Sequence, residues 1–211
     1  MTRGRFITVE GIEGVGKSTN IEVIVQHIEA AGLPVLTTRE PGGTPLAEDI
    51  REILMNRGEE PVPEIAELLL MFAARSFNVN NVIRPALEAG KWVVCDRFTD
   101  STRAYQGRGR GIPIETIDRI ASWVHGDTWP DLTILLDAPV DVGLARAGKR
   151  SEPDRIEREQ HAFFERVRNG YLDIARGEPG RVAVIDATRD IDSVRAATGA
   201  LIDRFLNDNP D

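Results

Sequence analysis

The segment from Gly11 to Ser18 has residue types and a spacing that could hold phosphate groups. It matches the pattern G-x-x-x-x-G-K-[ST] at every position. Glycines let successive backbone N–H groups point into one concavity, and the start of a helix adds a positive end. Lys17 supplies a compact charge for the outer phosphates, and the Ser18 hydroxyl is a magnesium ligand in this arrangement. We predict a loop that binds a nucleoside triphosphate, made of Gly11, Ile12, Glu13, Gly14, Val15, Gly16, Lys17, Ser18 and Thr19.

The loop alone does not choose between classes of phosphate-binding protein. A chance match is expected in about one chain of this length per hundred, and the apolar strand before the loop and the helical pattern after it lower that further. A GTPase should also carry an Asn-Lys-x-Asp element, but the chain has three lysines, and neither Lys91 nor Lys149 has that context. A large ATPase needs more chain than 211 residues. A kinase of a small molecule fits this length best.

Asp96 and Arg97 follow a buried apolar run and could serve a phosphorylated acceptor. The carboxylate can hold magnesium, and the arginine can grip an acceptor phosphate with two hydrogen bonds. The alternative is an ion pair at the end of a strand. Asp137 is a rival metal ligand because it also ends an apolar run, and Asp96 is preferred because an arginine follows it.

Two further basic segments could face phosphates. The first is the turn from Arg39 to Gly43, followed by Arg51, which in isolation would be read simply as a turn. The second is a predicted mobile lid at about 146–156, which in isolation would be read as a solvated surface. In a kinase, a basic lid can close over the transferring phosphoryl group and exclude water. Its basic residues are Arg146, Lys149, Arg150 and Arg155.

The elements that must position these residues alternate along the chain. Short apolar runs at 6–9, 35–38, 92–95, 132–136 and 182–185 predict strands, and helical periodicity separates them. This alternation predicts an α/β fold of three layers, with a parallel five-stranded sheet flanked by helices in one domain over 1–211. Ligands of such folds lie at the carboxyl ends of the strands, which places Gly11, Arg39, Asp96 and Asp137 at one edge.

Composition limits the partners and the location. The hydrophobic fraction of 41% and the charged fraction of 28% are ordinary for a globular protein. A net charge of −8 argues against a nucleic-acid or membrane-surface protein, since both usually need a basic face. The single cysteine, Cys95, excludes an intrachain disulfide, and no run is long enough for a signal peptide or a membrane span. We therefore expect a cytoplasmic protein.

Two segments resemble the signatures of bacterial thymidylate kinases. One runs from Val94 to Gln106 and the other from Thr38 to Thr44, and the similarity extends from about Phe6 to Asp186. The resemblance implies the fold of a P-loop nucleoside monophosphate kinase, with ATP and Mg²⁺, and phosphorylation of dTMP to dTDP in dTTP biosynthesis. It also implies a homodimer, plausibly through helices around 65–89 and 113–123. The alternatives are a kinase for another nucleoside monophosphate and a non-catalytic nucleotide-binding protein.

The resemblance also implies roles for the acceptor-side residues. Arginines would surround the acceptor monophosphate, and polar residues would line the nucleoside pocket. Arg75 would read the thymine edge. An aromatic residue usually covers the base four positions before the thymine-reading arginine, but Met71 occupies that position and Phe72 follows it, so either could cover the base. The implied acceptor-binding residues are Arg39, Arg51, Phe72, Arg75, Arg97, Ser101, Tyr105 and Gln106.

The catalytic roles implied by the resemblance are divided between the loop and the lid. Glu13 would lie near the 3′-hydroxyl of the acceptor sugar. The loop has no arginine at positions 12 to 15, so Arg150 in the lid would stabilise the transferred phosphoryl group. The implied catalytic residues are Lys17, Arg150, Arg97 and Glu13, with Ser18 and Asp96 as metal ligands. In contrast, Phe163, Phe164 and Tyr171 lie in a helical stretch and are expected to be core.

Overall fold

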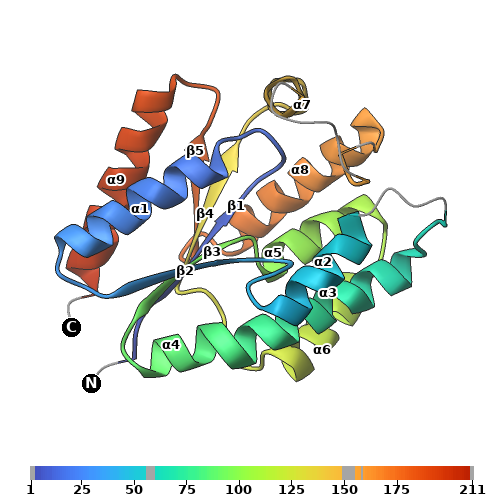
Figure 1. The fold of residues 1–211 in the computed structure, drawn as a ribbon. Helices are drawn as coiled ribbons and strands as arrows, with labels where there is room; N and C mark the ends of the chain where they lie inside the picture. Colours follow the sequence, from blue (N-terminus) through green and yellow to red (C-terminus); the bar gives the residue numbers. More distant parts are fainter. Residues whose placement is uncertain (1–2, 56–59, 149–154, 158, 210–211) are drawn as a thin grey trace.

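A computed structural model describes residues 3–55, 60–148, 155–157 and 159–209. At its centre lies a parallel five-stranded sheet with the strand order β2-β3-β1-β4-β5 (Figure 1). The strands are β1 (Phe6–Glu10), β2 (Val35–Arg39), β3 (Trp92–Asp96), β4 (Leu132–Asp137) and β5 (Val182–Asp186). Every strand lies where an apolar run predicts one, because residues buried on both faces of a sheet must be apolar along the whole strand.

Helices cover both faces of the sheet (Figure 1). Helices α1 and α9 pack side by side on one face, whereas α4 and α8 belong to the other side. Together with the sheet they form the predicted three layers. The helices are α1 (Lys17–Ala30), α2 (Pro45–Met55), α3 (Glu64–Asn78), α4 (Arg84–Glu88), α5 (Thr99–Thr102), α6 (Ile114–Val124), α7 (Val140–Ala147), α8 (His161–Gly177) and α9 (Ile191–Asp208).

The register of the strands brings the candidate residues to one edge. Asp96 pairs with Val9 in β1 and with Arg39 in β2, and Asp137 at the end of β4 pairs with Asp186. The residue after β1 is Gly11, where the glycine-rich loop begins. The carboxyl ends of the parallel strands therefore carry the loop and the strand-end carboxylates together, as the topology of such sheets predicts.

Two short π-helical segments interrupt the helices on the acceptor side. The first, η1 (Val79–Ile83), joins α3 to α4, and the second, η2 (Arg103–Gly109), follows α5. Segments of this kind occur frequently at functional sites, because they re-aim the side chains on a helix. Within η2, the side chains of Tyr105 and Gln106 are buried.

No helix within the described part of the chain has the length and hydropathy that a membrane crossing needs. Cys95, the single cysteine, is buried in β3 and packs with Phe6 and Val93 as part of the apolar core.

Candidate active site

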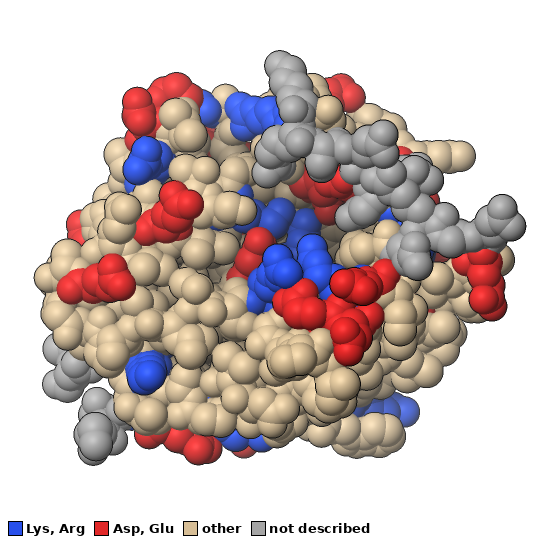
Figure 2. Space-filling model, viewed as in Figure 1, with Lys and Arg blue, Asp and Glu red and all other residues tan. Residues whose placement is uncertain are grey.

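A cavity of about 230 Å³ opens at the carboxyl ends of the strands. Figure 2 shows lysine and arginine atoms gathered in a hollow on this face, with acidic atoms beside them. The cavity brings together residues from the loop, from the ends of β2 and β3, and from α2, α3, α5 and η2. The predicted site residues that line it are Glu13, Gly14, Gly16, Lys17, Ser18, Arg51, Arg75, Asp96, Arg97, Ser101, Tyr105 and Gln106.

The glycine-rich loop depends on backbone conformations that favour glycine. Gly14 has a φ of 75°, and a Cβ there would lie 1.9 Å from the carbonyl oxygen of Gly143. The Lys17 ammonium donates hydrogen bonds to the carbonyl oxygens of Gly11 (3.2 Å) and Ile12 (3.0 Å). Burial, assisted by the nearby positive charge of Arg97, lowers the pKa of Lys17 to about 8. The ammonium therefore lies in a site where added negative charge would be favourable.

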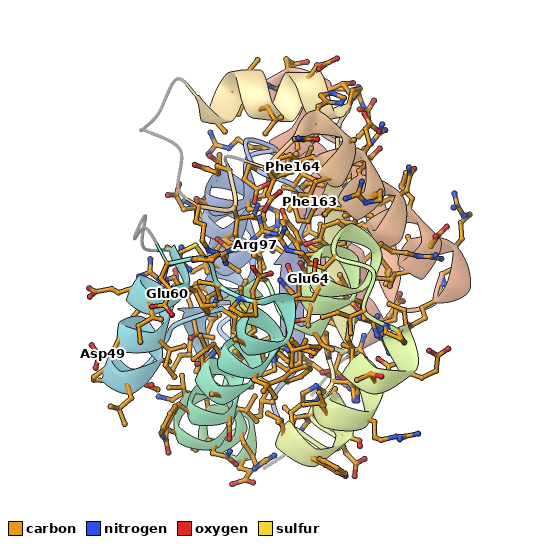
Figure 3. The ribbon with its side chains drawn as sticks, turned by 90° about the vertical axis from the view of Figure 1, so that its right-hand side faces the viewer. Asp49, Glu60, Glu64, Arg97, Phe163 and Phe164 are labelled. Atoms are coloured by element: carbon orange, nitrogen blue, oxygen red, sulfur yellow. The ribbon has the colours of Figure 1, made fainter. Side chains whose placement is uncertain are left out.

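Arg97 lies at the centre of the site (Figure 3) and has a φ of 69°, which is unusual for a residue with a side chain. Strained backbone of this kind is concentrated at functional sites. Its Nη2 donates to Glu13 Oε1 (3.0 Å), and its Nη1 donates to the hydroxyls of Ser101 (3.2 Å) and Tyr171 (3.0 Å). Arg97 thus forms a salt bridge with Glu13 in the loop, rather than with its neighbour Asp96.

Glu13 connects the loop to the nucleoside side of the cavity. The Tyr105 hydroxyl donates to both of its carboxylate oxygens, at 2.8 and 2.9 Å. The guanidinium of Arg97 lies over the Tyr105 ring, with 5.0 Å between the guanidinium carbon and the ring centroid. Three side chains from the loop, the end of β3 and η2 therefore fix one another's positions before any ligand is bound.

Beneath Arg97 lies a buried carboxyl group that sequence reasoning missed. Glu10, the last residue of β1, accepts hydrogen bonds from the Phe98 backbone N–H (2.7 Å), the Ser101 hydroxyl (2.6 Å) and the Tyr171 hydroxyl (3.0 Å). Burial, together with the nearby carboxylate of Asp100, raises the pKa of Glu10 to about 7. Tyr171 is buried as expected, but its hydroxyl also orients Arg97. The available signal was that Glu10 is a charged residue directly after an apolar run.

Arg75 is held by a second buried carboxylate and retains one unpartnered nitrogen. Its Nε donates to Glu40 Oε2 (2.6 Å), and its Nη2 donates to the Thr102 hydroxyl (3.0 Å). Burial raises the pKa of Glu40, although Arg75 opposes that rise. The guanidinium lies between the rings of Phe72 and Phe98, at 4.9 and 5.0 Å from their centroids. Its Nη1 is buried and has no hydrogen-bond partner among the described residues.

The structure distinguishes the two residues that could cover a base. Met71 lines the cavity. Phe72 is 2% exposed and packs with Leu68 and Ile117 behind Arg75. Since Phe72 is not among the residues that line the cavity, Met71 is the better placed of the two.

The remaining arginines predicted to bind the acceptor phosphate differ in position. Arg51 lines the cavity, and its Nη1 donates to the carbonyl oxygen of Pro41 (2.9 Å). Arg39 is not among the lining residues: its side chain is 55% exposed and forms two hydrogen bonds with Glu48 (3.2 and 2.8 Å). Arg51 is therefore placed to reach a ligand without rearrangement, whereas Arg39 would have to leave Glu48.

The two strand-end carboxylates have different environments. Both oxygens of Asp137 accept hydrogen bonds from Arg168, at 2.8 and 2.9 Å. Asp96 lines the cavity, and its buried Oδ1 has no partner among the described residues. No group of three or more metal-ligating side chains occurs within the part of the chain that is described. Magnesium held mainly by phosphates and water needs only one or two protein ligands, so Asp96 with Ser18 fits it better than Asp137.

Two of the predicted lid residues can be placed. Arg146 donates to the carbonyl oxygen of Ala187 (2.8 Å). Arg155 donates to Glu67 (2.6 Å) and to the carbonyl oxygen of Leu54 (2.8 Å). Lys149 and Arg150 lie outside the described residues, so the roles predicted for them stay predictions.

A parallel sheet of this order, a G-x-x-x-x-G-K-S loop between β1 and α1, and an arginine-lined cavity beside the loop define a P-loop kinase of the nucleoside monophosphate class. The sequence model of the thymidylate kinase family matches residues 9–198. The chain belongs to the thymidylate kinase family. The predicted family, fold class and enzyme class are therefore confirmed.

Individual relatives agree with this assignment. The chain is 56% identical over 206 residues to the thymidylate kinase of Methylococcus capsulatus, with 98% of each chain covered. It is 50% identical over 203 residues to that of Teredinibacter turnerae, covering 96% of this chain and 99% of the relative. The crystal structure of thymidylate kinase from Ehrlichia chaffeensis superposes with a TM-score of 0.76 at 35% identity, covering 95% and 99% of the two chains.

Proposed function

We propose that the protein catalyses ATP + dTMP → ADP + dTDP. The observation that carries the proposal is the buried, unpartnered Nη1 of Arg75 in a cavity that begins at the phosphate loop. A buried donor without a partner costs free energy, which a ligand acceptor such as a thymine carbonyl oxygen would recover. The same cavity is thus lined both by the loop that would hold a triphosphate and by a free donor that would hold a base.

The loop binds the donor. Its backbone N–H groups and the start of α1 hold the phosphates of ATP. Lys17 adds charge to the outer phosphates, and their negative charge restores the preference of the amine for its protonated form. When ATP is bound, the ammonium exchanges its contacts with the loop carbonyls of Gly11 and Ile12 for phosphate oxygens.

The arginines around the cavity bind and orient the acceptor. Arg97 and Arg51 hold the phosphate of dTMP, with Arg39 at the rim, and Glu13 lies beside the sugar. A phosphate oxygen of dTMP forms a bond to the γ-phosphorus of ATP, and the bond from that phosphorus to the β,γ-bridging oxygen breaks. The acceptor oxygen is already anionic, so no general base is required, and positioning and charge neutralisation carry the reaction.

Magnesium is the cation that these residues suit best. Asp96 and Ser18 would hold it, with phosphate and water oxygens completing its shell. When bound, the ion neutralises charge on the phosphates. In the Asp96→Asn variant we expect kcat to fall about a hundredfold and the Mg²⁺ requirement to rise. Asp137→Asn is the matched control, since Asp137 is paired with Arg168, and it should change the Mg²⁺ dependence less than twofold; equal effects would contradict the assignment.

A panel of acceptors tests the proposed reaction. The protein is assayed for ADP formation from ATP with dTMP, dUMP, UMP, CMP and AMP in parallel. We expect the highest kcat/KM for dTMP by a wide margin. A better acceptor among the others would replace thymidylate as the substrate. ATP binding without ADP formation from any of them would support the non-catalytic alternative.

We also propose that the lid at 146–156 completes the site and that Arg150 stabilises the transferred phosphoryl group. The loop has no arginine at positions 12 to 15, and Arg155 is occupied by Glu67. The expected result for Arg150→Ala is a loss of kcat of about a thousandfold with little change in KM for dTMP. A comparable loss in Arg146→Ala, whose arginine bonds the carbonyl oxygen of Ala187, would move the role to that residue.

Exposed apolar side chains on α2, α3 and α6 support the proposed homodimer. Trp123 on α6 is 81% exposed, Ile65 and Leu69 on α3 are more than half exposed, and α3 packs against both α2 and α6. Large exposed apolar side chains on packed helices are typical of an interaction surface. Sedimentation should show a dimer that Trp123→Asp converts to a monomer. Val184→Asp, on the half-exposed edge strand β5, is the control and should remain dimeric. A wild-type monomer would contradict the proposal.

A further inference from the structure

Glu67 is a buried carboxylate that contacts Gln106, one of the residues that line the cavity. It is 1% exposed and lies on α3, one helical turn before Met71 and two before Arg75, so all three lie along one face. It accepts hydrogen bonds from Gln106 Nε2 (2.7 Å), Arg155 Nη2 (2.6 Å) and Arg110, whose Nε and Nη2 lie at 3.4 and 3.2 Å.

The contact with Gln106 settles the orientation of an amide. Burial works against ionisation, but the hydrogen bond from Gln106, the charge of Arg110 and the hydrogen bonds from Arg155 and Arg110 hold the pKa of Glu67 below its usual value. An ionised carboxylate only accepts hydrogen bonds, so the NH₂ group of Gln106 must face Glu67. Gln106 lines the cavity, and its carbonyl oxygen is the end of the amide that remains for a ligand.

At Arg75, a second carboxylate leaves a hydrogen-bond donor facing the cavity, in contrast to the acceptor of Gln106. Glu40 and Thr102 accept from two of its nitrogens and leave Nη1 as a donor. Thr102 lies one helical turn before Gln106, so the two groups belong to the same wall of the cavity. Arg75 thus presents a donor, and Gln106 an acceptor, to the same cavity.

This pattern is complementary to one class of pyrimidine. Thymine presents O4 as an acceptor beside N3–H as a donor, whereas a cytosine ring presents a 4-amino donor beside an N3 acceptor. We propose that Glu67 is a positioning residue that determines base specificity, because it locks the amide of Gln106 with its oxygen toward the N3–H of the acceptor base. The proposal rests on the proposed function and extends it to a residue that does not touch the substrate.

The variant Glu67→Gln tests the polarity directly. Arg110 and Arg155 can only donate, so they claim the oxygen of the new amide and leave its NH₂ facing Gln106. Gln106 then turns its own oxygen toward that NH₂ and presents its NH₂ to the cavity. The acceptors to compare are dTMP and 5-methyl-dCMP, which share the methyl group and the ring shape but reverse the donor and acceptor at N3 and C4.

We expect Glu67→Gln to lower the ratio of kcat/KM for dTMP to kcat/KM for 5-methyl-dCMP by roughly tenfold to a hundredfold, the cost of one mismatched buried hydrogen bond. The change should appear in KM for the acceptor and leave KM for ATP within about twofold, since the phosphate loop is untouched. The ratio should not invert, because Arg75 still opposes a 4-amino group.

Arg110→Gln is the matched control. It removes a charge from the same cluster, yet it leaves the bond between Glu67 and Gln106 intact. We expect the wild-type ratio in this variant. A ratio that falls equally in Arg110→Gln and Glu67→Gln would show that Glu67 is only a structural partner of the arginines, and would overturn the inference.

A double variant tests the same polarity if Glu67→Gln alone does not fold. The pair Glu67→Gln with Arg110→Gln keeps the net charge of the cluster and should show the same lowered ratio. The wild-type ratio in either folded variant that carries Glu67→Gln overturns the inference while the proposed function stands. A wild-type protein that does not phosphorylate dTMP overturns the proposed function instead, and the affinities of the two nucleotides, measured by calorimetry, then give the ratio without turnover.

Discussion

The donor loop and the acceptor pocket share one cavity, but they are constructed differently. The loop takes its ligand-binding groups from the eight consecutive residues Gly11 to Ser18, and most of those groups are backbone N–H. The pocket takes side chains from α3, α5, η2 and the end of β3, and a carboxylate from another part of the chain holds each of two arginines. Glu40 holds Arg75, and Glu13 holds Arg97.

The loop and the pocket are therefore sensitive to different substitutions. The loop requires glycine at position 14, because a Cβ there would overlap the carbonyl oxygen of Gly143. The pocket depends on charge pairs, and removing one member leaves the other buried and unpaired. Substitutions far from the substrate should therefore disturb acceptor binding more than donor binding.

The largest effect should come from the one side-chain charge of the loop. Lys17→Met keeps the length of the side chain and removes its ammonium, and kcat should fall about a thousandfold because nothing else in the loop carries a positive charge. Steady-state kinetics measures the loss, and circular dichroism should show an unchanged fold. Residual activity above about a tenth of wild type would show that the backbone alone suffices.

Arg75→Ala should affect the acceptor pocket and leave the donor loop unchanged. The variant loses the unpartnered donor and leaves Glu40 buried without its cation, so kcat/KM for dTMP should fall about a hundredfold and the free energy of unfolding by about 3 kcal/mol. ATP affinity, measured by calorimetry, should stay within about twofold. Adding Glu40→Gln should recover part of the stability and none of the dTMP activity. A matching loss of ATP affinity would contradict the separation.

The third effect is on the pH dependence of stability, through Glu10. Its folded-state pKa of about 7 exceeds the ordinary value of 4.5, so the folded state binds its proton more tightly than the unfolded state does. Its favourable contribution is full below pH 4.5 and is lost as pH rises to about 7, which lowers the free energy of unfolding by about 3 kcal/mol. Glu10→Gln should remove this decline. Denaturant unfolding from pH 5 to 8 compares the two proteins, and parallel curves would show that Glu10 titrates normally.

The fold and the donor loop were predictable because their signals are local. Each strand is an apolar run, and the runs of β1, β2 and β3 end next to residues of the candidate site. The loop is contiguous, so its spacing alone identifies it. The order of parallel strands in such sheets then places Asp96 and Arg39 at one edge, as the register confirms.

The acceptor pocket was predictable only in part, through resemblance, because its contacts join residues far apart in sequence. Sequence reasoning assigned Tyr171 to the core. Its hydroxyl also accepts a hydrogen bond from Arg97, a residue 74 positions earlier in the sequence. Sequence reasoning could not decide whether Met71 or Phe72 covers the base. In the structure Phe72 packs in the core and Met71 lines the cavity. The sequence gives only a weak sign for Glu10, a charged residue directly after an apolar run, and none for Glu67, since a lone carboxylate in a helix or at the end of a strand is usually solvated.

The sequence by itself therefore determined the α/β fold and the phosphate loop, because hydrophobic periodicity and glycine spacing act over a few residues. Only the tertiary structure decided which charges meet. Asp96 and Asp137 end their strands alike, but Arg168 from α8 reaches only Asp137 and leaves an oxygen of Asp96 free of described partners. Burial gives such differences their weight, because a carboxylate withdrawn from water must find its partner within the protein.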